Sequence, residues 1–172
     1  AEMRPMAIER RLASAMARVP MNCMKNGKLT DPQMRALTTA LGRAKKAPIY
    51  YVNAVSGITT AQIGSKVKQA VKKHGVKLVI VDYLQKIKPD EKHEKRTYEV
   101  AQVSSGLKAI ADRNGVSVVA LAQLNRENVK DKVRLPKLSD FGDSGQIERD
   151  ADAAILLHRD FAENPSEASA IV

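Results

Sequence analysis

The chain is poor in aromatic and cysteine residues. Its 172 residues include no Trp, and aromatic residues make up 3% of the sequence, which disfavours a nucleic-acid surface built mainly on base stacking. Cys23 is the only cysteine, so an internal disulfide or a multi-cysteine metal site is excluded and a reducing, cytoplasmic setting is favoured. No apolar run approaches the roughly 18 residues of a membrane span, and residues 1–5 lack the pattern of a signal peptide. We therefore expect no contact with a membrane.

A glycine-rich phosphate loop ending in Gly-Lys-Ser/Thr is also missing. The segment Gly27-Lys28-Leu29-Thr30 superficially resembles the end of such a loop. However, Asn22 occupies the position of the first required glycine, and the lysine is followed by Leu29 instead of Ser or Thr. We interpret this segment as a turn between two helices.

Positive charge is present in excess and is unevenly distributed. The formal net charge is +10, and residues 1–46 supply +7 of it. Clustered Lys and Arg favour a polyanionic partner, because binding to phosphates releases counterions. The alternative is a basic protein without such a partner. Hydrophobic residues at 44% and charged residues at 28% are typical of a folded domain, and the length corresponds to one core.

Two apolar runs each end in a polar residue. Residues 77–81 precede Asp82, and residues 116–122 precede Gln123. Both runs are typical of buried parallel strands, and residues 49–52 and 153–157 are weaker strand candidates. Helical spacing over residues 5–19, a proline-containing start at residue 30, a capping box at 59–62, and a stop at Asn114-Gly115 predict intervening helices. The alternation predicts a largely parallel α/β sheet.

The two strand ends carry the first candidate site. A carboxylate such as Asp82 at the end of a buried strand can hold Mg²⁺, whereas its structural alternative is a turn or helix cap. The amide of Gln123 can orient a water molecule or sense a phosphate, or it can simply satisfy a neighbouring backbone group. The glycine-containing segment 139–152 can bring backbone N–H groups close to a phosphate backbone. Its alternative is a turn followed by a short charged helix.

Three motifs in one order resemble the DnaB-type hexameric replicative helicases. Residues 78–85 match the hydrophobic-Asp-Tyr-Leu-Gln motif, residues 120–127 match Ala/Ser-Gln-Leu-Asn/Ser-Arg, and residues 144–152 match Ser-Gly-x-Ile-Glu-x-Asp-Ala-Asp. Glu2-Met3 falls where the family has Ser-Leu-Glu-Met. The resemblance therefore extends over essentially the whole chain. It implies a RecA-like three-layer α/β core, with a mainly parallel sheet flanked by helices, incomplete at both ends.

The resemblance implies roles for individual residues. Asp82 would help to hold Mg²⁺, Glu2 would activate the hydrolytic water, and Gln123 would couple the γ-phosphate of ATP to the DNA-binding loops. Residues 86–96 and 125–145 would face a central channel that holds single-stranded DNA. The DNA contacts would come from Arg126, Lys130, Lys132, Arg134, Gly142, Asp143 and Gly145. Gly142 departs from the family pattern, because it stands where the family has arginine and so removes a phosphate contact.

The resemblance also predicts the organisation of the protein. We expect residues 1–47 to form a helical segment and residues 48–172 to carry the metal-holding strand, the sensor Gln123 and the DNA loops, all within one partial domain at 1–172. The phosphate loop would precede Ala1, and the arginine segment that reaches a neighbour's ATP would follow Val172.

The predicted function is an ATP-dependent replicative DNA helicase motor from a bacterium or a phage-infected host. The cofactors would be ATP and Mg²⁺, and the partners would be single-stranded DNA, a homo-hexamer, and a primase or helicase loader. The chain by itself would be inactive. The alternative is a non-catalytic nucleic-acid-binding or partner-binding remnant that keeps the sheet and has lost the motor.

Overall fold

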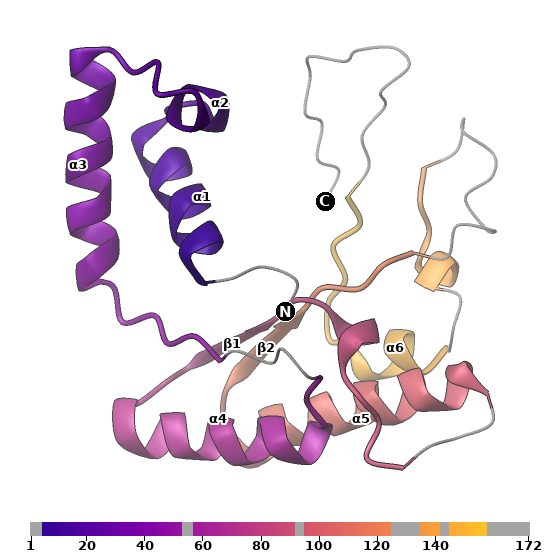
Figure 1. Cartoon of the computed structure of the whole chain (residues 1–172). Helices are drawn as coiled ribbons and strands as arrows, with labels where there is room; N and C mark the ends of the chain where they lie inside the picture. The colour runs from indigo at the N-terminus through magenta and orange to yellow at the C-terminus, as the bar shows by residue number, and fades with distance from the viewer. Residues whose placement is uncertain (1–4, 53–56, 92–94, 125–134, 142–144, 158–172) are drawn as a thin grey trace. The chain divides into compact units, whose positions relative to one another are not determined.

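A computed structural model describes residues 5–52, 57–91, 95–124, 135–141 and 145–157. The chain divides into two compact units, Ala1–Val55 and Ser56–Val172. Figure 1 shows that helices make up the first unit, whereas the second combines helices with two strands. Each unit is described by itself below.

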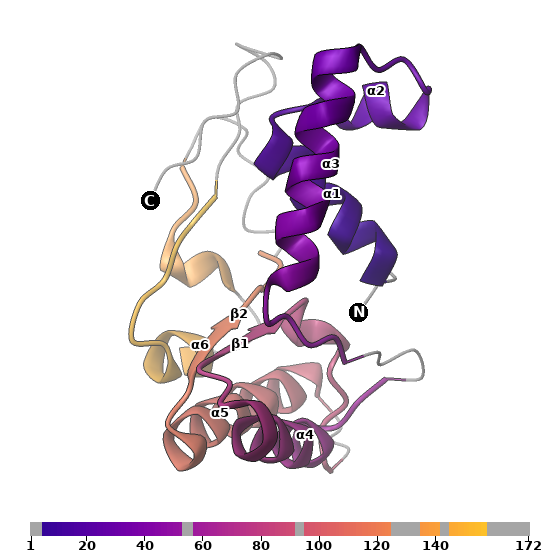
Figure 2. The ribbon, with the colours of Figure 1, turned by 90° about the vertical axis from the view of Figure 1, so that its left-hand side faces the viewer.

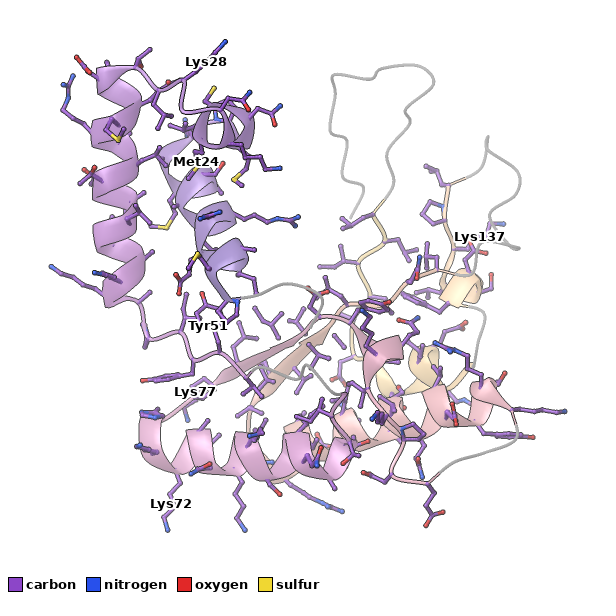
Figure 3. The ribbon with its side chains drawn as sticks, viewed as in Figure 1. Met24, Lys28, Tyr51, Lys72, Lys77 and Lys137 are labelled. Carbon is purple, nitrogen blue, oxygen red and sulfur yellow. The ribbon has the colours of Figure 1, made fainter. Side chains whose placement is uncertain are left out.

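The first unit contains three helices, α1 Pro5–Ala17, α2 Met21–Lys25 and α3 Asp31–Lys46. Thr30 caps α3 in a capping box with Gln33, as the proline-containing start at this position predicted. Between α2 and α3 the chain turns at Gly27, whose φ of +66° suits glycine. The segment that resembles a phosphate loop is therefore a turn between helices, as expected, and Lys28 projects outward from it (Figure 3). A small core of Ala13, Val19 and Leu37 holds the unit together.

The second unit contains two long helices, α4 Thr60–His74 and α5 Arg96–Asn114, and a short helix, α6 Gly145–Asp150. Thr59 and Gln62 form the predicted capping box of α4. Gly75 and Gly115 end α4 and α5 in the left-handed conformation that glycine adopts without steric cost. The helices α4 and α5 pack side by side along one face of the sheet (Figures 1 and 2).

The two apolar runs form the strands β1 Leu78–Val81 and β2 Ser117–Ala120, which pair in parallel. Val79 pairs with Val118 and Val81 with Ala120, and α5 provides the crossover between the strands. The parallel α/β arrangement predicted from the sequence is confirmed at this level. The described part of the chain contains this two-stranded sheet and no further strand pairing except an isolated bridge between Thr59 and Lys88.

The burial of the strands differs from the prediction. Val79, Val81 and Val118 pack against the core of α4 and α5, which is centred on Val67, Val103 and Leu107. The alternate side chains face away from these helices, and Ile80 remains 65% and Val119 51% exposed. The expectation of strands buried on both faces was therefore wrong, because helices of this unit cover one face of the sheet.

The two weaker strand candidates were also wrong. Residues 49–52 and 153–157 belong to no strand of the structure, and Ile49, Val52, Ile155 and Leu157 are all exposed. A strand needs a neighbour that accepts and donates its ladder hydrogen bonds. Among the described residues these two segments have no such neighbour, so apolar β-forming composition alone does not make them strands.

We predict that a methyl group at Gly106 destabilises the second unit. A Cβ atom built at Gly106 would collide with the side chain of Thr60, which is buried between α4 and α5. We expect Gly106→Ala to lower the free energy of unfolding by about 1–2 kcal/mol, because overpacking costs more than the roughly 1 kcal/mol of helix propensity gained. Urea unfolding followed by circular dichroism measures the effect.

Gly64→Ala is the matched control, since its Cβ would lie 3.4 Å from Cγ1 of Ile110, which is ordinary contact. This variant should be as stable as the parent chain or up to about 1 kcal/mol more stable. Adding Thr60→Ala to Gly106→Ala should restore stability, because it removes the colliding methyl and a buried hydroxyl that has no hydrogen-bond partner among the described residues. Equal stabilities of the two glycine variants would contradict the prediction.

Candidate functional site

The site lies where the two parallel strands end. Beyond the strands the backbone pairing continues, because Leu121 N donates to Val81 O at 2.9 Å and Leu84 N donates to Leu121 O at 2.8 Å. Asp82 and Gln123 thus follow neighbouring strands at the same sheet edge, as the sequence predicted. Both residues are exposed. This is the edge at which open parallel sheets bind their ligands.

The side chain of Gln85 joins the two strand ends. Its Nε2 donates to the backbone O of Gln123 at 2.9 Å, and its Oε1 accepts from the backbone N of Gln123 at 3.2 Å. The amide of one residue therefore satisfies both backbone groups of the other. Such a pair restrains the backbone of Gln123 in position and direction, although it leaves the Gln123 side chain available.

A second contact links Gln85 to the beginning of α5. Nη2 of Arg96 donates to the backbone O of Gln85 at 3.4 Å. One residue further on, Nζ of Lys86 lies 5.6 Å from the centre of the Tyr83 ring, within the range of a cation–π contact. The short 3₁₀ helix η1, Leu84–Lys86, is held in place by Leu84, which is buried in the core. The strand end is therefore attached to the core, to β2 and to α5.

Asp82 fits the role of a metal ligand only in part. It is exposed at the strand end, and carboxylate oxygens are ligands that Mg²⁺ prefers. The described residues contain no group of three or more His, Cys, Asp or Glu side chains that could hold a metal ion. The arrangement suits a cation that takes one protein carboxylate and obtains its other ligands from phosphates and water, and not an all-protein metal cage.

Asp140 is a buried carboxylate that sequence reasoning did not single out. It lies in the 3₁₀ helix η2, Leu138–Phe141, and is only 1% exposed. Its Oδ2 accepts from the backbone N of Lys137 at 2.8 Å, so the carboxylate closes the turn that begins η2. Phe141 packs against the main core. Asp140 thus anchors the end of the segment that was predicted to contact DNA, and its pattern of one Asp after Ser is too common to be recognised in advance.

Acidic residues of the third sequence motif bind α6 and the residues after it to α5. Oδ2 of Asp150 accepts from Oγ of Ser105 at 3.1 Å, and its Oδ1 accepts from Nε2 of Gln146 at 2.8 Å. Nζ of Lys108 lies 2.8 Å from Oδ2 of Asp152. The hydrogen bond to Asp152 raises the pKa of Lys108 above its usual 10.5, against an opposing effect of desolvation. These acids therefore have structural contacts, which the sequence did not reveal.

Most of the predicted DNA contacts lie outside the described residues, as does Glu2. The residues concerned are Glu2, Arg126, Lys130, Lys132, Arg134, Gly142 and Asp143. Gly145 is described as the first residue of α6, and its backbone O accepts from Nε of Arg149 at 3.1 Å. The structure thus brings together Asp82, Gln85 and Gln123, and these three residues share one sheet edge.

Parallel strands joined by a helical crossover, each followed by a polar residue at the carboxyl edge, define an α/β protein of the nucleotide-binding type. The comparison with known proteins specifies the class further. The chain matches the family of DnaB-like helicase C-terminal domains over residues 1–172. It belongs to this family, whose members are ATP-dependent replicative DNA helicases with a RecA-like ATPase domain.

The sequence relatives include the replicative DNA helicases DnaB of Leifsonia xyli subsp. xyli and Mycobacterium leprae. The first is 38% identical over 176 residues, covering 99% of this chain and 38% of the relative. The second is 37% identical over 158 residues, covering 92% of this chain and 26% of the relative. The chain thus spans between a quarter and two fifths of the length of these relatives.

Two solved structures are similar in three dimensions. One is a helicase-like ATPase domain with a TM-score of 0.86 and 29% identity, over 96% of this chain and 60% of that one. The other is a DnaB-like replicative helicase, described together with its interactions with primase. It has a TM-score of 0.87 and 30% identity, over 98% of this chain and 42% of that one. No helix in the described ranges combines the length and the apolar character needed to cross a membrane.

We predict that Gln85→Ala frees the backbone of Gln123. The variant loses two hydrogen bonds to the backbone of one residue, which contribute about 0.5–1.5 kcal/mol each. We expect the amide hydrogen of Gln123 to exchange with solvent about tenfold faster or more, while the amides of β1 and β2 keep their protection. Hydrogen exchange followed by NMR or mass spectrometry measures this difference.

Gln102→Ala is the matched control. Oε1 of Gln102 accepts from the backbone N of Glu91 at 3.4 Å, away from the strand ends. Exchange at Gln123 should be unchanged in this variant. Gln85→Glu keeps the acceptor and loses the donor, so it should retain part of the protection. If Gln85→Ala and Gln102→Ala leave Gln123 equally protected, the Gln85 contact does not restrain the strand end.

Proposed function

We propose that this chain is the ATPase motor of a replicative helicase that hydrolyses ATP, translocates on single-stranded DNA and unwinds duplex DNA. The observation that carries the proposal is the placement of Asp82 and Gln123 at one sheet edge, joined through Gln85, in a chain whose whole length matches the helicase family. The whole protein's activity goes beyond this chain, which spans a minor part of its relatives.

The nucleotide chemistry would require three contributions from this chain. Asp82 holds Mg²⁺, Glu2 activates the attacking water, and Gln123 detects the γ-phosphate of ATP. Bound Mg²⁺ neutralises charge that develops on the transferred phosphoryl group. The restrained backbone of Gln123 limits the positions that its side chain reaches, which is what a sensor of one phosphate group requires. A change in that side chain is transmitted through Gln85 to the beginning of α5.

The DNA contacts would come from two segments after the strands. Arg126, Lys130, Lys132 and Arg134 supply positive charge, whereas Gly142, Asp143 and Gly145 bring backbone groups close to a phosphate. Gly142 offers no cation where the family has arginine, so main-chain donors take the larger share of this contact. Asp140 supports the proposal because it anchors this segment to the core.

We further propose the organisation that accompanies this function. The sheet belongs to a three-layer RecA-like core within a partial domain at 1–172, with the helical segment 1–47 before the site-bearing segment 48–172. In the whole protein, six copies form a ring, and a primase or a helicase loader binds to it. The similarity to a helicase described with its interactions with primase supports the primase as a partner. Such a protein acts in the cytoplasm of a bacterium or a phage-infected host.

We predict that Asp82→Ala and Gln123→Ala each abolish DNA-stimulated ATP hydrolysis by the whole parent protein. Loss of the Mg²⁺ ligand removes charge neutralisation at the phosphates, and loss of the amide removes the sensor, so a decrease of about 100-fold or more is expected in each. The 172-residue chain alone should show no hydrolysis above background, because its sequence contains no phosphate loop. Phosphate release with and without single-stranded DNA measures both expectations.

Asp112→Asn is the matched control, since Asp112 is an exposed residue of α5 away from the strand ends. Its hydrolysis rate should equal that of the parent protein. If the parent protein binds DNA but neither hydrolyses ATP nor responds to Asp82→Ala, the non-catalytic binding remnant is the correct description. Full activity of Asp82→Ala would overturn the role of this carboxylate.

We predict that the loop after β2 binds single-stranded DNA electrostatically. Replacing Lys130, Lys132 and Arg134 together by Gln should lower the affinity of the chain and reduce the salt dependence by about 0.7 for each lost phosphate contact. Fluorescence anisotropy at several salt concentrations measures both quantities. Lys25, Lys28 and Lys45 replaced by Gln form a control of equal charge in the first unit, and an equal effect in that control would contradict a localised loop contact.

A further inference from the structure

The outer face of α4 carries a concentration of positive charge that the proposed function does not use. Residues 57–81 contain five lysines and no Asp or Glu, so this stretch supplies +5 of the net +10. All five residues are exposed. We define the α4 lysine face as Lys66, Lys68, Lys72 and Lys73, together with Lys77 after the helix.

The helix geometry arranges these lysines in two rows. Ile63 and Val67 are buried and orient one side of α4 toward the core. Lys66 and Lys73 lie two turns apart along one edge of the outer side, about 10 Å along the axis, and Lys68 and Lys72 lie one turn apart along the other edge, about 6 Å. In Figure 3, Lys72 and Lys77 both extend away from the ribbon near the same end of α4.

No anionic partner compensates these charges within the described part of the chain. None of the five ammonium groups forms an ion pair or a side-chain hydrogen bond there. Lys68 and Lys72 are like charges four residues apart on a helix, which is unfavourable. The helix dipole favours cations in the last turn of α4 and so accounts for Lys72 and Lys73. It does not account for Lys66, Lys68 or Lys77.

The remaining surface of this face indicates the kind of partner. Between the two rows lie Ala61, Ser65 and Gln69, which are exposed and small or polar. A protein partner would need a buried apolar or aromatic anchor at the centre of its interface, and α4 offers none on this side. Phosphate groups need only cations and hydrogen-bond donors, which lysine supplies as a point charge. The face is therefore suited to a phosphate backbone.

We propose that the α4 lysine face is a second nucleic-acid-binding surface, which holds the sugar–phosphate backbone of DNA. The surface has no aromatic side chain for stacking and no groups arranged to read bases, so it binds single-stranded and duplex DNA without sequence preference. It is distinct from the loop after β2, because its lysines precede β1 and belong to α4 or directly follow it. The proposal goes beyond the motor function and does not depend on ATP hydrolysis.

The test replaces Lys66, Lys68, Lys72 and Lys73 by Gln in the 172-residue chain. Gln keeps the helix propensity close to that of Lys, and circular dichroism verifies folding. Binding of labelled duplex and single-stranded DNA of mixed sequence is followed by fluorescence anisotropy from low to moderate salt. We expect about tenfold weaker binding at low salt, and a salt dependence on duplex DNA reduced by about 2–4, since each phosphate contact contributes about 0.9.

Two further variants make the result specific. The control replaces Lys25, Lys28, Lys45 and Lys46 by Gln, which removes the same charge from the first unit and also includes lysines in a last helical turn. Lys→Arg at the four α4 positions retains the charge and should retain binding. If the Gln variant does not fold, the single changes Lys66→Gln and Lys73→Gln replace it, each with an expected decrease of about 0.9 in the salt dependence.

The proposal is overturned if the control loses as much affinity as the α4 variant, because net charge alone would then explain binding. It is equally overturned if the α4 variant binds like the parent chain. Polyglutamate serves as a competitor, and competition as strong as that of unlabelled DNA would assign the face to an acidic protein partner instead. The proposed helicase function stands or falls separately, through Asp82→Ala and the loop variant.

Discussion

The pair of hydrogen bonds between the Gln85 side chain and the Gln123 backbone is the contact on which the candidate site depends. Two adjacent parallel strands bring their ends to one edge, but the chain beyond each strand is free to diverge. The Gln85 amide prevents this because it satisfies the C=O and the N–H of one residue at 2.9 and 3.2 Å. Arg96 extends the connection to α5. The carboxylate of Asp82 and the amide of Gln123 can therefore act on one ligand, since their supports are a single connected structure.

The core of the second unit explains why this support is firm. Helices α4 and α5 cover one face of the sheet through Val79, Val81 and Val118, and they approach closely where Gly106 faces Thr60. The same core continues just after Asp82 through Leu84 and Ile87, so the residues around the carboxylate are attached to packed side chains. The later segment is attached in the same way through Asp140 and Phe141. The exposed polar ends of the site thus rest on apolar residues a few positions away.

Local signals in the sequence predicted much of the fold but few of the contacts within the site. The capping boxes at Thr30 and Thr59 and the left-handed Gly115 were predictable, because each depends on a few neighbouring residues. The strand candidates at 49–52 and 153–157 failed, because a strand depends on a partner that its own composition does not supply. The Gln85–Gln123 contact joins residues 38 apart, and the Ser105–Asp150 contact joins residues 45 apart. Neither contact has a sequence pattern, so both required the tertiary structure.

The positive charges of the second unit belong to two different environments. On α5, Lys108 has Asp152 as a partner at 2.8 Å and neighbours Asp112 and Asp150, which favour its protonated form. On α4, the lysines have no such acids among the described residues, although the two helices pack against each other. A basic composition alone would distribute acids and lysines over both helices. Because the acids are concentrated beside α5 and α6, the positive potential outside α4 is not cancelled locally. Within about one Debye length, some 10 Å, it acts on whatever anion approaches. The α4 lysine face is therefore an electrostatic feature of the fold and not merely a consequence of the net charge.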